Sequence, residues 1–307
     1  MRPPEEPMSA PAPTDETVND ETVDDETVDD ETVDDEMVDD ETVDDETAGD
    51  ETVDDETAGD ETVDDAPVVV VTGASAGIGA ATARRLATDG TRVVLAARRA
   101  ERLETVADDC RSAGVETAVV PTDVTDRAAV EALFTAVEER FGRLDGVVVN
   151  AGIGEEHTDA VDALPVEQFE AVTETNVHGA FYTTRAALPA LREHGGTVVF
   201  VGSYKGIYPS TSSPVYAASK WWLRGFAKSV AGQVGPDGVA VTIVNPTGVR
   251  TEFGSEFRDR PNAEALDPAT TVGVDDVADA IAFALAQDPP TAVAELDLFR
   301  RDIHERF

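Results

Sequence analysis

Two side chains four residues apart, Tyr216 and Lys220, have the clearest capacity for proton chemistry in this chain. Residues at i and i+4 of a helix share one face, with stems about 5–6 Å apart. An ammonium at that distance favours the phenolate and lowers the pKa of the phenol from its usual value of about 10. Such a tyrosine can give and take a proton near pH 7. Alternatively, Tyr216 packs as a helix aromatic and Lys220 is a solvated charge, and the pair alone leaves both interpretations open.

A glycine-rich segment, Thr72–Gly79, follows a run of four valines and opens an expected helix. Glycines let the backbone turn tightly and approach a pyrophosphate, which then lies at the positive N-terminus of the helix. A plain tight turn is the alternative. The position between the first strand and the first helix favours a dinucleotide site.

The elements that must position these residues alternate along the body of the chain. Strands are predicted at Val68–Thr72, Arg92–Ala96, Glu116–Pro121, Gly146–Asn150, Thr197–Ser203, Ala240–Val244 and Ala292–Leu298. Helices are predicted at Gly77–Thr88, Ala100–Ala113, Ala128–Phe141, Val166–Arg192, Val215–Val234 and Val274–Ala286. Continuous valine runs are typical of strands covered on both faces. The alternation therefore predicts an α/β fold with a doubly wound parallel sheet of about seven strands.

The first 66 residues have a different composition. Residues 16–65 form ten acidic pentads, mostly Glu-Thr-Val-Asp-Asp, and residues 1–66 carry a net charge of −29. Burying the few apolar side chains of this segment cannot offset the conformational entropy that the chain would lose on ordering. A disordered, self-repelling tail is therefore predicted. A divalent-cation sponge and a polyanion mimic that occupies a basic partner are alternatives. A repeat solenoid is a third, disfavoured because like charges would stack.

Residues 67–307 form the predicted single domain and carry a net charge of −12, with only three lysines. This acidic, lysine-poor composition resembles that of cytoplasmic proteins from salt-loving (halophilic) microbes, and it argues against nucleic acid and anionic membranes as partners. A lone cysteine, Cys110, excludes an intramolecular disulfide and suits a reducing cytosol. No apolar run approaches the ~18 residues of a membrane span, so a cytoplasmic location is expected.

Several motifs occur in the order and spacing of one protein family. They are Thr72-Gly73-x-x-x-Gly77-Ile78-Gly79, Asn150-Ala151-Gly152, Asn176-Val177-His178-Gly179, Ser203 and Tyr216-x-x-x-Lys220. Residues 67 to about 300 resemble the single-domain branch of the short-chain dehydrogenase/reductase family. The resemblance implies a Rossmann-type fold and a catalytic tetrad of Asn176, Ser203, Tyr216 and Lys220.

The resemblance also implies a nicotinamide cofactor, and the end of the second strand indicates which one. An acidic residue there would bind a ribose 2′-hydroxyl, whereas a cation would accept a 2′-phosphate. The chain has Ala97 at that position, followed by Arg98 and Arg99, so NADP(H) is predicted and NAD is less favoured. The alternative is that both arginines point to solvent. Asp123 matches the family's adenine-binding aspartate, with a helix cap as the alternative.

The residues expected to contact the cofactor end or follow the first, second, third, fourth and sixth predicted strands or lie on the helix that carries Tyr216. They are Thr72, Gly73, Ser75, Gly77, Ile78, Gly79, Arg98, Arg99, Asp123, Val124, Asn150, Ala151, Gly152, Tyr216, Lys220, Pro246, Val249 and Thr251.

The predicted function is an NADP(H)-dependent oxidoreductase that transfers a hydride between nicotinamide and the carbonyl or alcohol carbon of a small molecule. Tyr216 is the predicted acid and base, Ser203 the donor to the carbonyl oxygen, and Asn176 the residue that orients a water near Lys220. The alternative is a non-catalytic NADP(H)-sensing protein with an acidic interaction tail. An epimerase or dehydratase is a further rival, disfavoured because residues 190–307 are too few for its larger substrate domain.

The substrate cleft is expected between residues Tyr204–Pro214 and the irregular stretch Glu252–Pro268. Trp221 and Trp222 are predicted to pack, one inward and one at a subunit interface, in a homodimer or homotetramer. The four histidines lack ligand spacing, so no catalytic metal is predicted.

Overall fold

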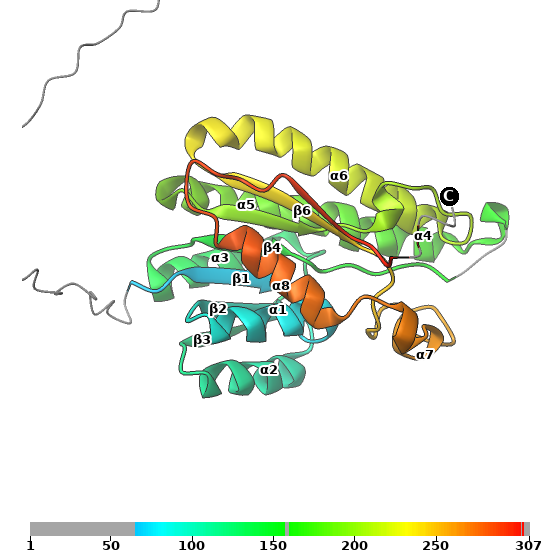
Figure 1. The fold of residues 1–307 in the computed structure, drawn as a ribbon, viewed down its shortest axis with the longest axis horizontal. Coiled ribbons are helices and arrows are strands. Elements are labelled where there is room, and N and C mark those ends of the chain that lie inside the picture. Colours follow the sequence, from blue (N-terminus) through cyan, green and yellow to red (C-terminus); the bar gives the residue numbers. More distant parts are fainter. Residues whose placement is uncertain (1–64, 157–159, 302, 304–307) are drawn as a thin grey trace, which may run out of the picture. The chain divides into compact units, whose positions relative to one another are not determined.

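A computed structural model describes residues 65–156, 160–301 and 303 of the 307-residue chain. At its centre lies a seven-stranded parallel sheet in the order β3-β2-β1-β4-β5-β6-β7 (Figure 1). The strands are β1 (Val68–Thr72), β2 (Arg92–Ala97), β3 (Thr117–Pro121), β4 (Gly146–Val149), β5 (Thr197–Val201), β6 (Ala240–Pro246) and β7 (Glu295–Leu298). The predicted Rossmann-type, doubly wound single domain is confirmed.

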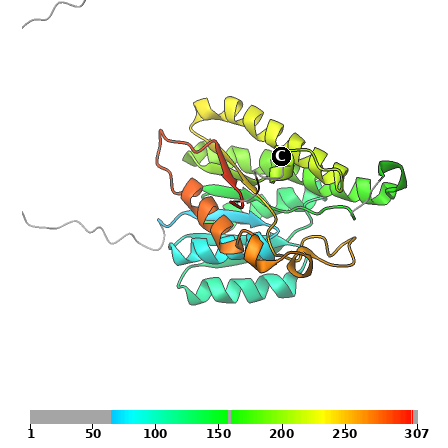
Figure 2. The same ribbon diagram turned by 45° about the vertical axis from the view of Figure 1, so that its right-hand side comes forward.

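Helices cover both faces of the sheet, because successive side chains of each strand point to opposite sides. In β1, Val68 and Val70 enter one core while Val69 and Val71 enter the other, and none of the four is more than 3 % exposed. Burying each such side chain contributes about 1.5–3 kcal/mol. The first core lies against α3, α5 and α6, and the second lies against α1, α2 and α8 (Figures 1 and 2). The helices are α1 (Gly77–Thr88), α2 (Ala100–Ser112), α3 (Arg127–Phe141), α4 (Val166–Thr173), α5 (Ala180–His194), α6 (Pro214–Val234), α7 (Asn262–Ala265) and α8 (Val274–Leu285).

The order of the strands reverses beside β1. From β1 the chain proceeds outward to β2 and β3, and then crosses back to place β4 on the other side of β1. The connections after β1 and β4 therefore leave in opposite directions and open a crevice at the carboxyl edge of the sheet. Ligands of doubly wound sheets bind in such a crevice.

One predicted helix contains a change of helix type. Residues Val166–Arg192 were expected to form one helix, and the chain is helical without a break from Val166 to His194. Within it, the π-helical turn Glu174–Gly179 separates α4, which ends at Thr173, from α5, which begins at Ala180. Turns of this kind insert one residue and are frequent at functional sites. This one contains the buried Asn176, whose bonds to a distant loop give the turn its shape. Hydrophobic periodicity does not report such a contact.

The prediction that one of the two tryptophans points inward is wrong. Trp221 is 48 % exposed and Trp222 is 36 % exposed, and Trp222 stacks on Phe226 with ring centroids 4.8 Å apart. Lys220 and Leu223 occupy the inward face of α6, so the two positions between them point away from the sheet. An indole at a subunit interface stays a prediction.

The acidic pentads, Glu16 to Asp65, lie almost entirely outside the described residues. Across the parts of the chain that the structure describes, no helix combines the length and apolarity that crossing a membrane requires.

The edge strand β7 is shorter than predicted and is held by a charged cluster on its first residue. Glu295 accepts from Arg224 at 2.6 and 2.9 Å and from the Asn245 amide at 2.7 Å, and it pairs with Lys228 at 2.8 Å. Hydrogen bonds from Arg224, and then from Lys228, lower the pKa of Glu295 to about 2.

We therefore predict that acid destabilises the fold through protonation of Glu295. A carboxyl whose pKa is lower in the folded than in the unfolded chain stabilises the fold above the unfolded pKa, and this contribution is lost as the pH falls toward 2. A shift from 4.5 to about 2 corresponds to about 3 kcal/mol. Glu295→Gln should lower the free energy of unfolding by that order at pH 7, and by much less near pH 2. Urea unfolding of both proteins across this pH range measures it, and an equal difference at every pH would contradict the assignment.

Candidate active site

The glycine-rich turn joins the end of β1 to the start of α1. Gly73 and Gly77 have φ values of 66° and 56°, which residues with a side chain rarely adopt. A Cβ at Gly79 would lie 2.5 Å from the carbonyl oxygen of Gly73, so this position also excludes a side chain. The first N–H groups of α1 receive no side-chain cap. The backbone is thus free to approach an anionic diphosphate, and the turn fits the pyrophosphate of a dinucleotide.

Hydrogen bonds tie this turn to the end of β4. The Thr72 hydroxyl donates to the Val148 carbonyl at 3.1 Å and accepts from the N–H groups of Asn150 and Ala151 at 3.0 and 3.2 Å. The Asn150 amide donates to the Thr72 carbonyl at 2.8 Å. These bonds hold the ends of β1 and β4 together where the strand order reverses.

A cavity of about 550 Å³ opens at this edge of the sheet. It is lined by Gly73, Ser75, Gly77, Ile78, Arg98, Arg99, Asp123, Val124, Asn150, Ala151, Gly152, Ser203, Tyr216, Lys220, Pro246, Val249 and Thr251, all of which were predicted from the sequence. Three predicted residues, Thr72, Gly79 and Asn176, do not line it. They are buried beside it and position the residues that do.

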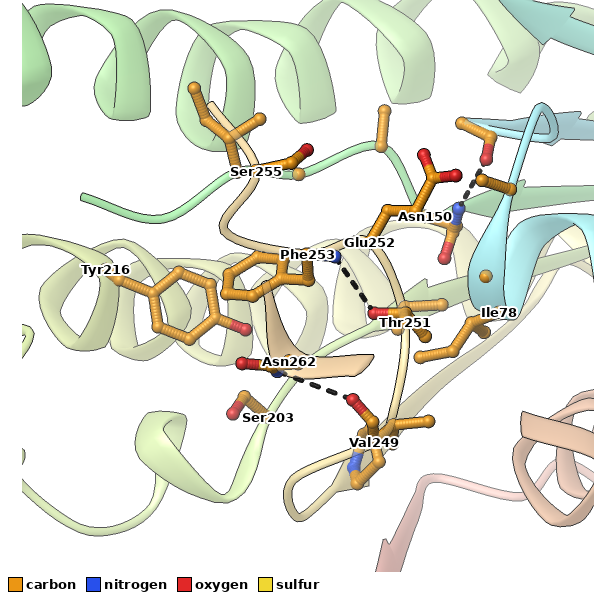
Figure 3. Close-up of a pocket in the computed structure, with 18 of the residues that line it drawn as sticks. Ile78, Asn150, Ser203, Tyr216, Val249, Thr251, Glu252, Phe253, Ser255 and Asn262 are labelled. Carbon is orange, nitrogen blue, oxygen red and sulfur yellow. Dashed lines mark hydrogen bonds between the residues drawn. The ribbon is translucent and has the colours of Figure 1, made fainter. Parts of the chain in front are cut away.

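Tyr216, Ser203 and Lys220 meet in the wall of the cavity. Tyr216 and Lys220 lie one turn apart on α6, and the Lys220 Nζ is 5.7 Å from the centre of the Tyr216 ring. Lys220 donates to the carbonyl of Val201, the last residue of β5, at 2.7 Å. Ser203 follows β5 in extended conformation and its hydroxyl accepts from the N–H of Lys205 at 3.2 Å. Figure 3 shows the phenol of Tyr216 with Ser203 on the same cavity wall and the ring of Phe253 alongside, 5.0 Å away between centroids.

The pKa of Tyr216 was expected to be lowered by Lys220, but in the structure it is raised. Burial raises this pKa to about 12, and a hydrogen bond with the Ser203 hydroxyl acts in the opposite direction. Burial lowers the pKa of Lys220 to about 8. Both shifts arise because burial penalises the charged form of each group, which is the phenolate of Tyr216 and the ammonium of Lys220. Near neutral pH the phenol is therefore protonated in this structure.

Asn176 lies behind the cavity wall. Its side chain exchanges two hydrogen bonds with the backbone of Ile153, both at 2.9 Å, and donates to the Ser219 hydroxyl at 3.0 Å. A Cβ built on Gly152 would lie 3.3 Å from the Asn176 Oδ1 and 3.6 Å from the Lys220 Nζ. The two side chains thus approach each other across Gly152, which leaves little room for a larger residue.

The opposite end of the cavity carries the residues expected at the adenosine. Asp123 accepts from the N–H and hydroxyl of Thr125, whereas the cap of α3 is Asp126. Arg99 donates to the Ser75 hydroxyl at 2.9 Å and pairs with Glu252 at 3.0 Å. Arg98 is exposed at the cavity rim. The rim therefore presents arginines beside the glycine-rich turn, a donor set that fits a ribose phosphate.

Three charged residues near Tyr216 were not singled out from the sequence. Glu155 is fully buried and accepts from the N–H groups of Val215 and Tyr216 at 2.9 and 3.0 Å, so it caps the first turn of α6. Lys205 and Arg258 line the cavity, one after β5 and one after β6. Their proximity to Tyr216 is set by chain segments far apart in sequence. The sequence did carry a signal for two of them, since Lys205 and Arg258 lie in the stretches Tyr204–Pro214 and Glu252–Pro268 that were expected to line the substrate cleft.

The sequence of residues 67–262 matches the family model described as short chain dehydrogenase. The chain belongs to this family. As a short-chain dehydrogenase it is an oxidoreductase that uses a nicotinamide cofactor and acts on hydroxyl or carbonyl groups of small molecules.

Known short-chain dehydrogenases resemble it over most of its length. An uncharacterized oxidoreductase of Staphylococcus aureus (strain MW2) is 32 % identical over 230 residues, which are 75 % of this chain and 95 % of the relative. An alcohol dehydrogenase of the archaeon Thermococcus sibiricus, solved with 5-hydroxy-NADP, has a TM-score of 0.69 and 32 % identity, covering 76 % of this chain and 97 % of its own. A 3-ketoacyl-(acyl-carrier-protein) reductase of Brucella melitensis, solved with NADH, has a TM-score of 0.67 and 28 % identity over 75 % of this chain and 96 % of its own.

We predict that Glu155 stabilises the helix that carries Tyr216. Removing a side chain that accepts from the first N–H groups of a helix costs about 1–2 kcal/mol. Glu155→Ala should lower the free energy of unfolding by this amount, and Glu155→Gln by less because one acceptor oxygen remains. Urea unfolding at pH 7 measures both, with the exposed Glu170→Ala on α4 as the control. Equal stability of Glu155→Ala and Glu170→Ala would contradict the capping role.

Proposed function

We propose that this short-chain dehydrogenase transfers a hydride between NADP(H) and the carbonyl or alcohol carbon of a small substrate, with Tyr216 as acid and base. The observation that carries the proposal is the meeting of Tyr216, Ser203 and Lys220 in the same cavity as the glycine-rich turn. A sensor that only bound the cofactor would not need this group of proton-handling side chains beside it.

In the proposed mechanism, bound NADPH supplies the hydride and the protein supplies position and proton transfer. The Ser203 hydroxyl donates to the carbonyl oxygen of the substrate. The Tyr216 hydroxyl gives its proton to that oxygen as the alcohol forms, and accepts it in the reverse direction. Lys220 faces Tyr216 and supplies positive charge where the phenolate develops. Asn176 keeps the π-helical turn and the Ile153 loop in place behind Lys220.

The protonation states favour the reductive direction near neutral pH. A phenol with a pKa of about 12 is protonated at pH 7 and is ready to donate. Lys220, with a pKa of about 8, is mainly protonated at the same pH and loses its charge as the pH rises. Oxidation requires the phenolate, so we expect it to need a higher pH than reduction.

The preference for NADP(H) over NAD(H) is also part of the proposal. Ala97 ends β2 without a carboxylate, and Arg98 and Arg99 follow it on the cavity rim. Solved relatives include one with 5-hydroxy-NADP and one with NADH, so membership of the family does not by itself identify the preferred cofactor. Arginine supplies the planar donors that a 2′-phosphate accepts. Asp123 and Val124 are proposed for the adenine, and Pro246, Val249 and Thr251 for the nicotinamide end.

Assembly into a homodimer or homotetramer is proposed on a surface observation. Trp221, Trp222 and Phe181 are large apolar side chains left exposed on α5 and α6. Such a patch is typical of an interface between proteins. The acidic, lysine-poor composition supports a cytoplasmic, halophilic setting.

We predict that Tyr216→Phe binds NADPH nearly as wild type does but turns over at least ~10²-fold more slowly, because general acid catalysis is lost. Stopped-flow NADPH oxidation with a panel of ketones in high salt measures turnover, and fluorescence titration measures binding. Wild-type turnover by the variant would remove Tyr216 from the mechanism. Binding of NADPH by the wild-type protein with no ketone reduced would favour the sensor instead.

We also predict that the double substitution Arg98→Ala and Arg99→Ala raises the KM for NADPH by about 10–100-fold, the value of one bidentate phosphate contact. The KM for NADH should change little, since NADH has no 2′-phosphate. Arg102→Ala is the control, because Arg102 pairs with Glu252 as Arg99 does but does not line the cavity. An equal loss with both cofactors would reject the 2′-phosphate contact.

A further inference from the structure

Two cationic side chains that the hydride-transfer proposal does not use stand beside Tyr216. Lys205 lies in the short 3₁₀ turn Tyr204–Gly206, and its Nζ is 6.0 Å from the centre of the Tyr216 ring. Arg258 comes from the segment after β6 and lies over the ring of Phe253, which is itself beside Tyr216. Both line the cavity and both are half-buried.

Neither cation has a carboxylate partner among the residues that the structure describes. The Lys205 ammonium donates to the Ser213 hydroxyl at 2.9 Å, and the Arg258 Nε donates to the Glu155 carbonyl at 2.8 Å. These acceptors are neutral. Elsewhere in the described chain, arginines commonly pair with a carboxylate, as Arg84 does with Asp109 and Arg192 does with Asp237.

The carboxylates nearby form an ion pair with neither Lys205 nor Arg258. Glu155 accepts from the backbone N–H groups of Val215 and Tyr216. Glu252 is paired with Arg99 and Arg102, on the cofactor side of the cavity. Glu256 lines the cavity but is exposed to water. The wall around Tyr216 therefore carries more positive than negative charge.

This excess runs against the composition of the protein. The domain carries a net charge of −12, and its lysines are Lys205, Lys220 and Lys228, two of which line this cavity. Holding two half-buried cations near each other without an ion-pair partner is unfavourable. The pKa of Lys205 reflects this, because burial, and after it the positive charge of Arg258, lowers the pKa to about 8. An anion bound between the two cations would offset the repulsion between them.

We propose that the substrate carries a carboxylate, held by Lys205 and Arg258, while its carbonyl carbon faces Tyr216. This assignment rests on the proposed function. It makes the substrate an oxo acid, or the corresponding hydroxy acid, with the two groups a few bonds apart. The charge-assisted hydrogen bonds from both cations would orient the carbonyl toward Ser203 and Tyr216.

The test compares acids with their neutral methyl esters. NADPH oxidation by the full chain is followed with pyruvate, acetoacetate and levulinate and with the methyl ester of each. We expect at least one acid to have a kcat/KM at least about tenfold above that of its ester, the value of one charge-assisted hydrogen bond. Lys205→Met and Arg258→Met should each remove this preference, mainly through the KM of the acid, and leave the kinetics of the ester within about twofold.

Three further variants separate charge from folding. Lys205→Arg and Arg258→Lys keep the positive charge and should retain most of the preference for the acid. Lys228→Met is the matched control, because Lys228 pairs with Glu295 on the surface and does not line the cavity. Circular dichroism checks that each variant is folded. Equal turnover of every acid and its ester, or equal losses for both in Lys205→Met, would overturn the assignment.

A binding measurement keeps this inference distinct from the proposed function. Calorimetric titration of butyrate, which has no carbonyl to reduce, into the NADP⁺-saturated protein reports the carboxylate site without turnover. Binding that Lys205→Met abolishes and Lys228→Met retains would support the site, even if no ketone were reduced. No binding of butyrate together with reduction of neutral ketones would reject the carboxylate site and leave the hydride-transfer function standing.

Discussion

The architecture of the active site depends on the hydrogen bonds between Thr72 and Asn150. A doubly wound sheet has one place where neighbouring strands send their connections in opposite directions, and here that place lies between β1 and β4. The buried Thr72 hydroxyl and the Asn150 amide close the two strand ends on each other. The glycine-rich turn starts from one end and the loop that holds Asn176 starts from the other. The same hydrogen bonds between Thr72 and Asn150 therefore position both sides of the cavity.

Two buried charged residues beside Tyr216, Glu155 and Lys220, each have defined hydrogen-bond partners. Glu155 is buried but faces the N–H groups at the start of α6, which supply the positive end of a helix. Lys220 is buried but donates to the end of β5. The desolvation that makes these groups costly also moves their pKa values, so that a protonated phenol and an ammonium that titrates near pH 8 stand one turn apart.

Much of the fold was predictable because its signals are local. The runs of valine indicated strands buried on both faces, and Val68–Thr72 and Gly77–Thr88 have the predicted bounds. The glycine-rich turn and the residues of the predicted tetrad were located because their motifs and spacing resemble those of the family. The π-helical turn at Asn176 and the raised pKa of Tyr216 were not predictable in this way, because hydrophobic periodicity does not identify the neighbours of these residues. The outward direction of Trp221 follows instead from the helix itself, since Lys220 and Leu223 occupy its inward face.

By itself the sequence determined the class of fold, the family and which residues we propose for proton transfer and for contact with the cofactor phosphates. It did so because those features reside in the order and spacing of residue types along the chain. Only the tertiary structure decided the electrostatic environment in which these residues work. Burial, and the arrival of Glu155, Lys205 and Arg258 from three separate loops, set the charge of the cavity wall. An electrostatic environment is a sum over neighbours in space, and those neighbours exist only once the chain has folded.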